Sequence, residues 1–174
     1  MCSDILISLD LEHSENLIAG IKTVELRRRR LSIRKGSRVW IYTKKPRASV
    51  NAVGLVLAVH AGSADVLWRK FSTRLAISRE HFDRYLLGAT EGCAIEFSEV
   101  NLLQEPIQLS DLRRQVERFQ PPQFFKNLDN DHTTLTILRR HAGLSAEGQT
   151  AFCLREVFPP TVANDQCTRQ SVIA

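Results

Sequence analysis

The sequence predicts a mixed α+β domain in which several short strands form a small closed or partly closed β-barrel with inserted and peripheral helices. Short runs of β-branched and aromatic residues recur along the chain, as strands require. Between them, apolar residues recur at helical spacing and are bounded by capping residues and glycines. This periodicity fades after Gly143, so we expect a domain over residues 1–142 and a loosely ordered C-terminal tail over residues 143–174.

The elements follow in order from local patterns. Residues 5–9 form a short apolar run that predicts a strand, and Ser14 is a plausible N-cap for a helix that stops before Gly20. Residues 23–30 alternate, with Val24 and Leu26 on one face of a predicted strand. Further strands are predicted at 38–43, 53–59, 93–97 and 100–109, the last broken near Pro106, and further helices at 65–71, 78–87, 110–116 and 133–141.

The composition is that of an ordinary soluble chain with a basic balance. The 174 residues suit one domain with a tail, and 43% of them are apolar, enough for a core. The net charge of +5 and the isoelectric point near 9.3 favour anionic partners such as RNA, DNA or nucleotides. The start of the chain has no signal-peptide pattern, and no apolar run reaches the roughly 18 residues of a membrane span. We therefore expect no membrane association and a cytoplasmic location.

The cysteines and histidines indicate neither metal nor cofactor chemistry. The four cysteines, at positions 2, 93, 153 and 167, form no Cys-x-x-Cys pair and have no histidine at metal-ligand spacing. We expect no metal site, no cofactor, and a small-hydrophobe role for Cys93. The five histidines follow no catalytic order, so we expect them at the surface or at helix ends.

The segment 20–27, Gly-Ile-Lys-Thr-Val-Glu-Leu-Arg, is the candidate working site. On a strand, Thr23, Glu25 and Arg27 project from one face, with alternate side chains about 6.5–7 Å apart, and Lys22 lies at the strand entrance. A carboxylate between two cations should stay ionised, so Glu25 could accept a hydrogen bond from a base edge or act as a general base. The cations could bind a phosphate or an oxyanion. A surface ladder of ion pairs is the alternative interpretation.

Further cations and aromatic residues surround this segment. In the basic run 27–30, Arg27 and Arg29 are expected to extend the cleft, while Arg28 and Arg30 face away. In residues 38–43, one alternating pair should face the core, and the other, with Tyr42, could stack on a base. A phosphate-contacting rim, or alternatively a solvated basic edge, is expected from Arg34, Lys35, Lys44, Lys45 and Arg47.

The ordered set of motifs resembles the ASCH domain family, a branch of the PUA-like barrels. The similarity covers roughly residues 4–140 and has Gly20-x-Lys22-Thr23-x-Glu25-x-Arg27 at its centre. Its other members are Ser8, Leu17-Ile18, Trp40-Ile41-Tyr42-Thr43, Pro46, Val53-Gly54, Ser78-Arg79-Glu80, Phe82, Tyr85, Gly88, Ala94-Ile95 and Pro121-Pro122-Gln123.

The resemblance implies a PUA-like β-barrel, a cleft lined by residues 22–27, and recognition of RNA or nucleosides. Some bacterial relatives are amidohydrolases that remove an acetyl group from acetylcytidine. They share Lys22 but carry a catalytic threonine where this chain has Glu25, and a carboxylate is a weak substitute for a hydroxyl nucleophile. Thr23 could offer a hydroxyl from the same strand face. Glu80 is the only nearby candidate for a second glutamate that those enzymes use.

We therefore expect an RNA- or nucleotide-binding module, regulatory in its role, with DNA as an alternative ligand. Lys22 and Arg27 would engage phosphate or a carbonyl oxygen, and Glu25 would accept from a base amino group or orient Lys22. The other expected ligand-binding residues are Ser8, Tyr42, Thr43, Lys44 and Lys45. One alternative is a small hydrolase, an acetylcytidine-type amidohydrolase or a ribonuclease, that uses Lys22 with Thr23 or Glu25. Another is a regulatory domain whose basic face binds an acidic protein.

Overall fold

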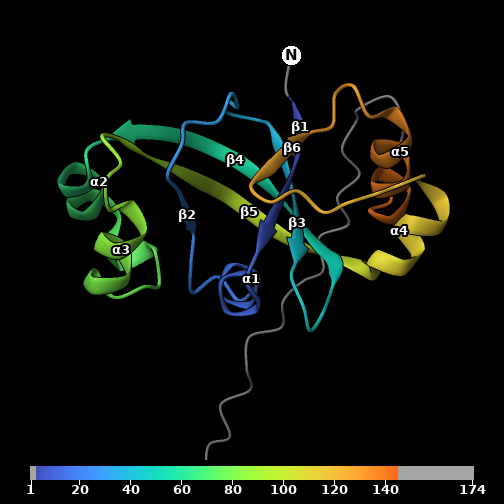
Figure 1. Cartoon of the computed structure of the whole chain (residues 1–174), viewed down its shortest axis with the longest axis horizontal. Helices are drawn as coiled ribbons and strands as arrows, with labels where there is room; N and C mark the ends of the chain where they lie inside the picture. Colours follow the sequence, from blue (N-terminus) through green and yellow to red (C-terminus); the bar gives the residue numbers. More distant parts are fainter. Residues whose placement is uncertain (1–2, 145–174) are drawn as a thin grey trace, which may run out of the picture.

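A six-stranded sheet, in the order β2-β5-β4-β3-β1-β6, forms the centre of the computed structural model, which describes residues 3–144. Its strands are β1 (Asp4–Leu9), β2 (Val24–Arg27), β3 (Arg38–Thr43), β4 (Ser49–Gly62), β5 (Gly92–Gln108) and β6 (Phe125–Asn127). The α-helices are α1 (Leu11–Ile18), α2 (Ala64–Phe71), α3 (Arg79–Leu86), α4 (Leu109–Gln115) and α5 (His132–His141). The sheet curls into a half-barrel, with α2 and α3 at one end of β4 and β5 and with α4 and α5 at the other (Figure 1). This confirms the expected α+β class in its partly closed form.

The strands β1 and β3 pair in parallel, with Leu6 opposite Trp40, and all other neighbours are antiparallel. A parallel pair needs a crossover connection, which α1 and β2 supply between these two strands. As a result, β1 and β3 end side by side at Leu9 and Thr43, next to the start of α1. The cavity described below opens at this edge of the sheet.

The two longest strands, β4 and β5, run the length of the molecule. The expected break near Pro106 is wrong: β5 passes through it, because Val50 faces Ile107 while Ala52 already faces Leu102, so Pro106 lies in a bulge of the ladder. Near the middle of β4, a Cβ atom at Gly54 would lie 2.7 Å from the Phe97 ring. Only glycine fits there, and this close approach allows the two strands to curve together.

Both faces of β3 are buried. Val39 and Ile41 pack into a central cluster beneath α1, and Trp40 and Tyr42 pack into a second cluster beneath α4 and α5. Tyr42 is only 4% exposed. The expectation that this face could stack on a base is therefore wrong, because α4 and α5 cover the side of the strand that the sequence pattern left open.

Several element ends differ from expectation because tertiary contacts decide them. Asp10, rather than Ser14, stands at the N-cap of α1, and the buried Ser14 hydroxyl is instead hydrogen-bonded to Thr43 Oγ1 at 2.6 Å. Strand β2 ends at Arg27 instead of residue 30, and the short strand β6 was not expected. Asp131 is the N-cap of α5, as predicted, and its carboxylate accepts from the Thr134 amide.

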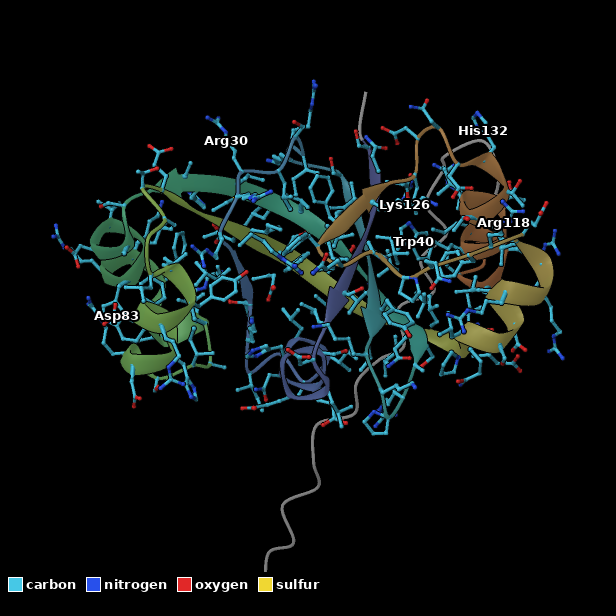
Figure 2. All side chains as sticks on the ribbon, in the orientation of Figure 1. Arg30, Trp40, Asp83, Arg118, Lys126 and His132 are labelled. Carbon is cyan, nitrogen blue, oxygen red and sulfur yellow. The ribbon has the colours of Figure 1, made fainter. Side chains whose placement is uncertain are left out.

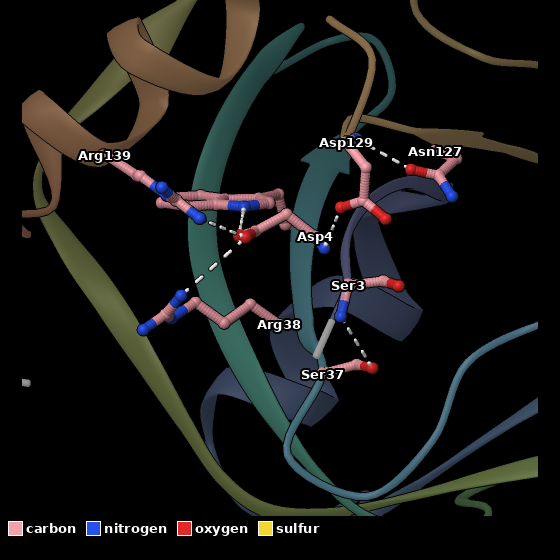
Figure 3. Close-up of polar contacts among 8 residues, drawn as sticks. Ser3, Asp4, Ser37, Arg38, Asn127, Asp129 and Arg139 are labelled. Carbon is pink, nitrogen blue, oxygen red and sulfur yellow. Dashed lines mark hydrogen bonds and ion pairs between the residues drawn. The ribbon is translucent and has the colours of Figure 1, made fainter. Parts of the chain in front are cut away.

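A buried polar cluster joins the first strand to α5 (Figure 3). One carboxylate oxygen of Asp4 accepts a hydrogen bond from Trp40 Nε1 at 2.8 Å. The other lies 2.7 Å from an Arg139 nitrogen and 3.7 Å from an Arg38 nitrogen. The carboxylate is thus shared between β3 and α5, which places α5 against the sheet.

Most of the expected C-terminal tail (143–174) lies outside the described residues, as do the cysteines at positions 2, 153 and 167. Cys93 is fully buried in β5, as a small hydrophobe would be. Within residues 3–144, no helix has both the length and the apolar character needed to cross a membrane.

Candidate functional site

A cavity of about 840 Å³ lies between the end of β1, α1, β2 and α3, and the segment before β6 closes one side of it. This volume lies within the range of about 300–1,000 Å³ that is usual for small-molecule pockets. Five of the side chains predicted to form the site line it: Ser8, Lys22, Glu25, Arg27 and Lys44. The cavity is therefore built around the segment that the sequence singled out.

The turn after α1 places Lys22 in the cavity. Gly20 has a φ of +71°, a left-handed conformation that favours glycine, and it follows the C-cap residue Ala19. The chain then folds back, so that the Lys22 amide donates to Asn16 O at 2.9 Å. Lys22 thereby reaches the cavity two residues before β2 begins.

Lys22, Glu25 and Arg27 form one buried ion cluster. The Lys22 Nζ lies 2.7 Å from Glu25 Oε2, and the Arg27 Nε lies 3.1 Å from Glu25 Oε1. The three residues are 3%, 5% and 9% exposed. Val24 and Leu26, on the opposite face of β2, pack against α2 and α3 and hold the strand in place. A solvated ladder of ion pairs is thus the wrong description of these residues.

The cluster holds two cations and one anion, so its net charge is positive. Burial raises the pKa of Glu25, but Lys22 and Arg27 together outweigh it and hold that pKa below its ordinary value, as the sequence predicted. Arg27 Nη1 donates to Phe124 O at 3.3 Å. Its Nη2 is buried and has no hydrogen-bond partner among residues 3–144. This donor is available to an acceptor atom of a ligand.

Ser8 and Lys44 also line the cavity, and each has a partner. The Ser8 hydroxyl donates to Pro122 O at 2.6 Å, which attaches the segment before β6 to β1. Lys44 Nζ lies 3.2 Å from Asp10 Oδ1, and the side chains of Lys44 and Asp10 are 48% and 68% exposed. Ser8 therefore shapes the cavity wall, whereas Lys44 can exchange its partner for a ligand.

Four predicted residues do not line the cavity. Tyr42 lies in the core, and the buried Thr43 hydroxyl is bonded to Ser14 and Asn51. Lys45 is exposed on the loop after β3. Thr23 precedes β2, and its hydroxyl accepts from Arg74 Nε at 2.9 Å. Strand alternation predicted a shared face with Glu25, but the strand begins one residue too late for it.

Among the cavity-lining residues that sequence reasoning missed are His13, His81, Tyr85 and Phe124. His81 and Tyr85 follow the N-cap Ser78 at helical spacing, so Ser78, His81 and Tyr85 share one face of α3. That spacing could have identified both residues as lying on one face with the cap. Phe124, 60% exposed, comes from a distant segment, and no local signal indicates it.

Two of these missed residues have shifted pKa values. Burial, and next the charge of Lys22, lower the pKa of His13 below 6.5, so its imidazole is neutral at pH 7. The buried His13 Nδ1 has no hydrogen-bond partner among the described residues. Burial raises the pKa of Tyr85, which therefore keeps its hydroxyl proton. No cluster of histidine, cysteine, aspartate or glutamate that could hold a metal ion occurs within residues 3–144.

Comparison with known proteins identifies relatives of this chain in sequence and in fold. An ASCH domain-containing ribonuclease of Zymomonas mobilis is 29% identical over 130 residues, which cover 75% of this chain and 87% of the relative. The crystal structure of ASCH from Zymomonas mobilis matches with a TM-score of 0.71 and 28% identity, covering 78% of this chain and 94% of that one. A hypothetical protein from Leishmania major shares only the fold, with a TM-score of 0.51, 12% identity, and coverage of 82% and 96%. No family model matches the sequence.

Proposed function

Because this chain is an ASCH domain protein, homologous over most of its length to a ribonuclease of Zymomonas mobilis, we propose that it cleaves single-stranded RNA in the cavity around Lys22, Glu25 and Arg27. The similarity favours the ribonuclease alternative over the binding-only hypothesis. The observation that carries the proposal is the buried cluster of net positive charge, with one arginine donor unpartnered.

A phosphodiester group fits this cluster by charge and by hydrogen bonding. One phosphate charge neutralises the excess cation, and a phosphate oxygen accepts from Arg27 Nη2, which otherwise stays unsatisfied. Because the cluster is held out of water, the cations stabilise developing negative charge on the phosphate more strongly than exposed cations do. Glu25 keeps Lys22 and Arg27 in position, and its low pKa makes it a poor proton acceptor.

His13 is the group in the cavity suited to start the reaction. Its neutral imidazole takes the proton of the ribose 2′-hydroxyl while the 2′-oxygen attacks phosphorus. The bond from phosphorus to the 5′-oxygen of the next nucleotide breaks, and that oxygen takes a proton from solvent in the cavity. The products are a 2′,3′-cyclic phosphate and a 5′-hydroxyl. The 2′-hydroxyl requirement selects RNA over DNA.

The acetylcytidine amidohydrolase alternative lacks a nucleophile in this geometry. The Thr23 hydroxyl is bonded to Arg74 and lies outside the cavity lining. Glu80, the candidate second glutamate, is exposed and paired with Arg84 on α3. Neither residue is placed to act on a ligand bound at Lys22.

The proposal is tested by cleavage of a fluorophore–quencher RNA oligonucleotide by two single variants, Lys22→Met and Arg27→Gln. Each variant leaves Glu25 paired with the remaining cation, so the fold is expected to survive, and circular dichroism checks this. We expect kcat/KM to fall about a hundredfold or more in each, as when one transition-state donor is lost.

The matched control is Lys45→Met, which removes an exposed lysine outside the cavity and is expected to cleave like the wild type. A substrate with 2′-deoxyribose at the scissile position should not be cleaved. Folded Lys22→Met and Arg27→Gln proteins that retain full activity would overturn the site assignment. A wild-type protein that binds the RNA without cleaving it would overturn the ribonuclease proposal and support the binding-only hypothesis.

A further inference from the structure

A second groove lies on the other side of the basic run, where the β2–β3 loop crosses β4. Its volume is about 760 Å³. Its floor is apolar and includes Leu57, which is 40% exposed, with Ala58 and Val59 half-buried beside it. The exposed side chains of Arg30 and Arg34 stand at its rim.

The lining of this groove is cationic. Its lining includes Arg30, Arg34 and Lys35 and no carboxylate. Arg30 and Arg34 form no ion pair with any residue in the described part of the chain. Several other exposed arginines in the described part of the chain do have a carboxylate partner, such as Arg79 with Asp83 at 2.8 Å. A cationic rim over an apolar floor suits a single nucleic-acid strand, with phosphates on the rim and bases or sugars on the floor.

One pair of side chains connects the cavity wall to the basic run that continues into this groove. Phe124 lines the cavity, and the Arg29 guanidinium lies over its ring at 5.9 Å from the centroid. Arg30, the next residue, lines the groove. A strand that left the cavity along this pair would meet the exposed Phe124 ring and then Arg29, which is next to Arg30 in the chain. Exposed aromatic rings of this kind stack bases at about 1–3 kcal/mol per base.

We propose that the groove at Arg30 and Arg34 is a second RNA-binding site, which holds the phosphates of the same strand beyond the nucleotides in the cavity, with Phe124 and Arg29 bridging the two. This inference rests on the proposed function, because it takes the strand in the cavity to be RNA. It predicts that affinity depends on RNA length through this groove.

The test measures binding of fluorescein-labelled 2′-O-methyl oligouridylates by anisotropy, because a blocked 2′-oxygen allows binding without cleavage. One probe has three nucleotides and fills the cavity alone, and the other has about twelve. For Arg30→Ala with Arg34→Ala, we expect the long probe to bind roughly tenfold more weakly. The slope of log affinity against log salt should fall in magnitude by about 1.4, at about 0.7 for each phosphate contact on a single strand. The short probe should bind unchanged.

The matched control is Arg118→Ala with Arg140→Ala, which removes two exposed cations at the opposite end of the molecule. Figure 2 shows Arg30 and Arg118 on opposite sides of the view. The control should bind both probes like the wild type. Equal losses in both double variants, an equal loss for the short probe, or no loss for the long probe would overturn the groove. Cleavage of unmodified RNA, measured separately, tests the proposed function: length-dependent binding without cleavage would support the groove and overturn the ribonuclease.

Discussion

At the scale of single residues, the pKa of His13 links the cavity's electrostatics to a measurable rate. Burial and the nearby Lys22 both lower this pKa below 6.5. A general base acts when deprotonated, so kcat/KM for RNA cleavage should rise with pH, with the midpoint of the rise below pH 6.5. Lys22→Met removes one lowering cause, so the residual activity of that variant should show an acidic limb displaced to higher pH.

The pH profile distinguishes His13 from a merely structural residue. His13→Gln should abolish the acidic limb and reduce the rate by about 10²–10⁴-fold. His132→Gln, at the start of α5 and outside the cavity lining, is the matched control and should change neither. An unchanged limb in His13→Gln would show that another group takes the proton.

At the scale of elements, the Asp4 cluster predicts how firmly α5 is held against the sheet. Asp4→Ala leaves Trp40 Nε1, Arg38 and Arg139 without their shared acceptor. Asp4 is 2% exposed, so its loss breaks a buried ion pair, but both arginines reach solvent and can be hydrated there. We therefore expect the free energy of unfolding to fall by about 2–3 kcal/mol, near the lower limit for a broken buried pair. Urea unfolding followed by circular dichroism measures it.

Asp4→Asn keeps the acceptor for Trp40 and should be less destabilising than Asp4→Ala. The matched control is Glu80→Ala, which breaks an exposed pair with Arg84 and should change stability by less than about 1 kcal/mol. If Asp4→Ala were no more destabilising than Glu80→Ala, the cluster would not hold α5.

The same scale shows which elements local sequence can predict. Helices α3 and α5 were predictable because Ser78 and Asp131 are caps that act within one turn. Strand β6 was not, because its three residues are a strand only through pairing with β1. Ser14 has the chemistry of an N-cap, but its partner is Thr43 on a distant strand. A tertiary hydrogen bond overrides the local capping propensity of a residue when both require the same side-chain hydroxyl.

The residues of the candidate site likewise include some that local sequence predicts and some that it does not. Lys22, Glu25 and Arg27 were predictable together because they are neighbours in one segment, and strand alternation relates the last two. Phe124 was not predictable, because its place in the cavity depends on Arg27 and Ser8 holding the segment before β6. Local sequence thus predicts part of the cavity wall, and the chain topology determines the rest.

At the scale of the whole molecule, β4 and β5 join the three core clusters into one cooperative unit. Val53 belongs to the cluster beneath α4 and α5, Val56 and Ile95 to the central cluster, and Ala94 to the cluster beneath α2 and α3. Loss of either end would expose the same two strands. We therefore expect the α2–α3 end and the α4–α5 end to unfold in a single two-state transition.

The two tryptophans of the chain report on opposite ends. Trp40 is buried beneath α4 and α5, whereas Trp68 packs on Phe82 with ring centroids 5.0 Å apart in the α2–α3 end. In Trp68→Phe, fluorescence follows Trp40, and in Trp40→Phe it follows Trp68. Within each variant, the urea midpoint from fluorescence should coincide with that from circular dichroism. If the fluorescence and circular dichroism midpoints differ in Trp40→Phe, α2 and α3 unfold on their own. The cavity wall that carries His81 and Tyr85 would then open independently of the sheet.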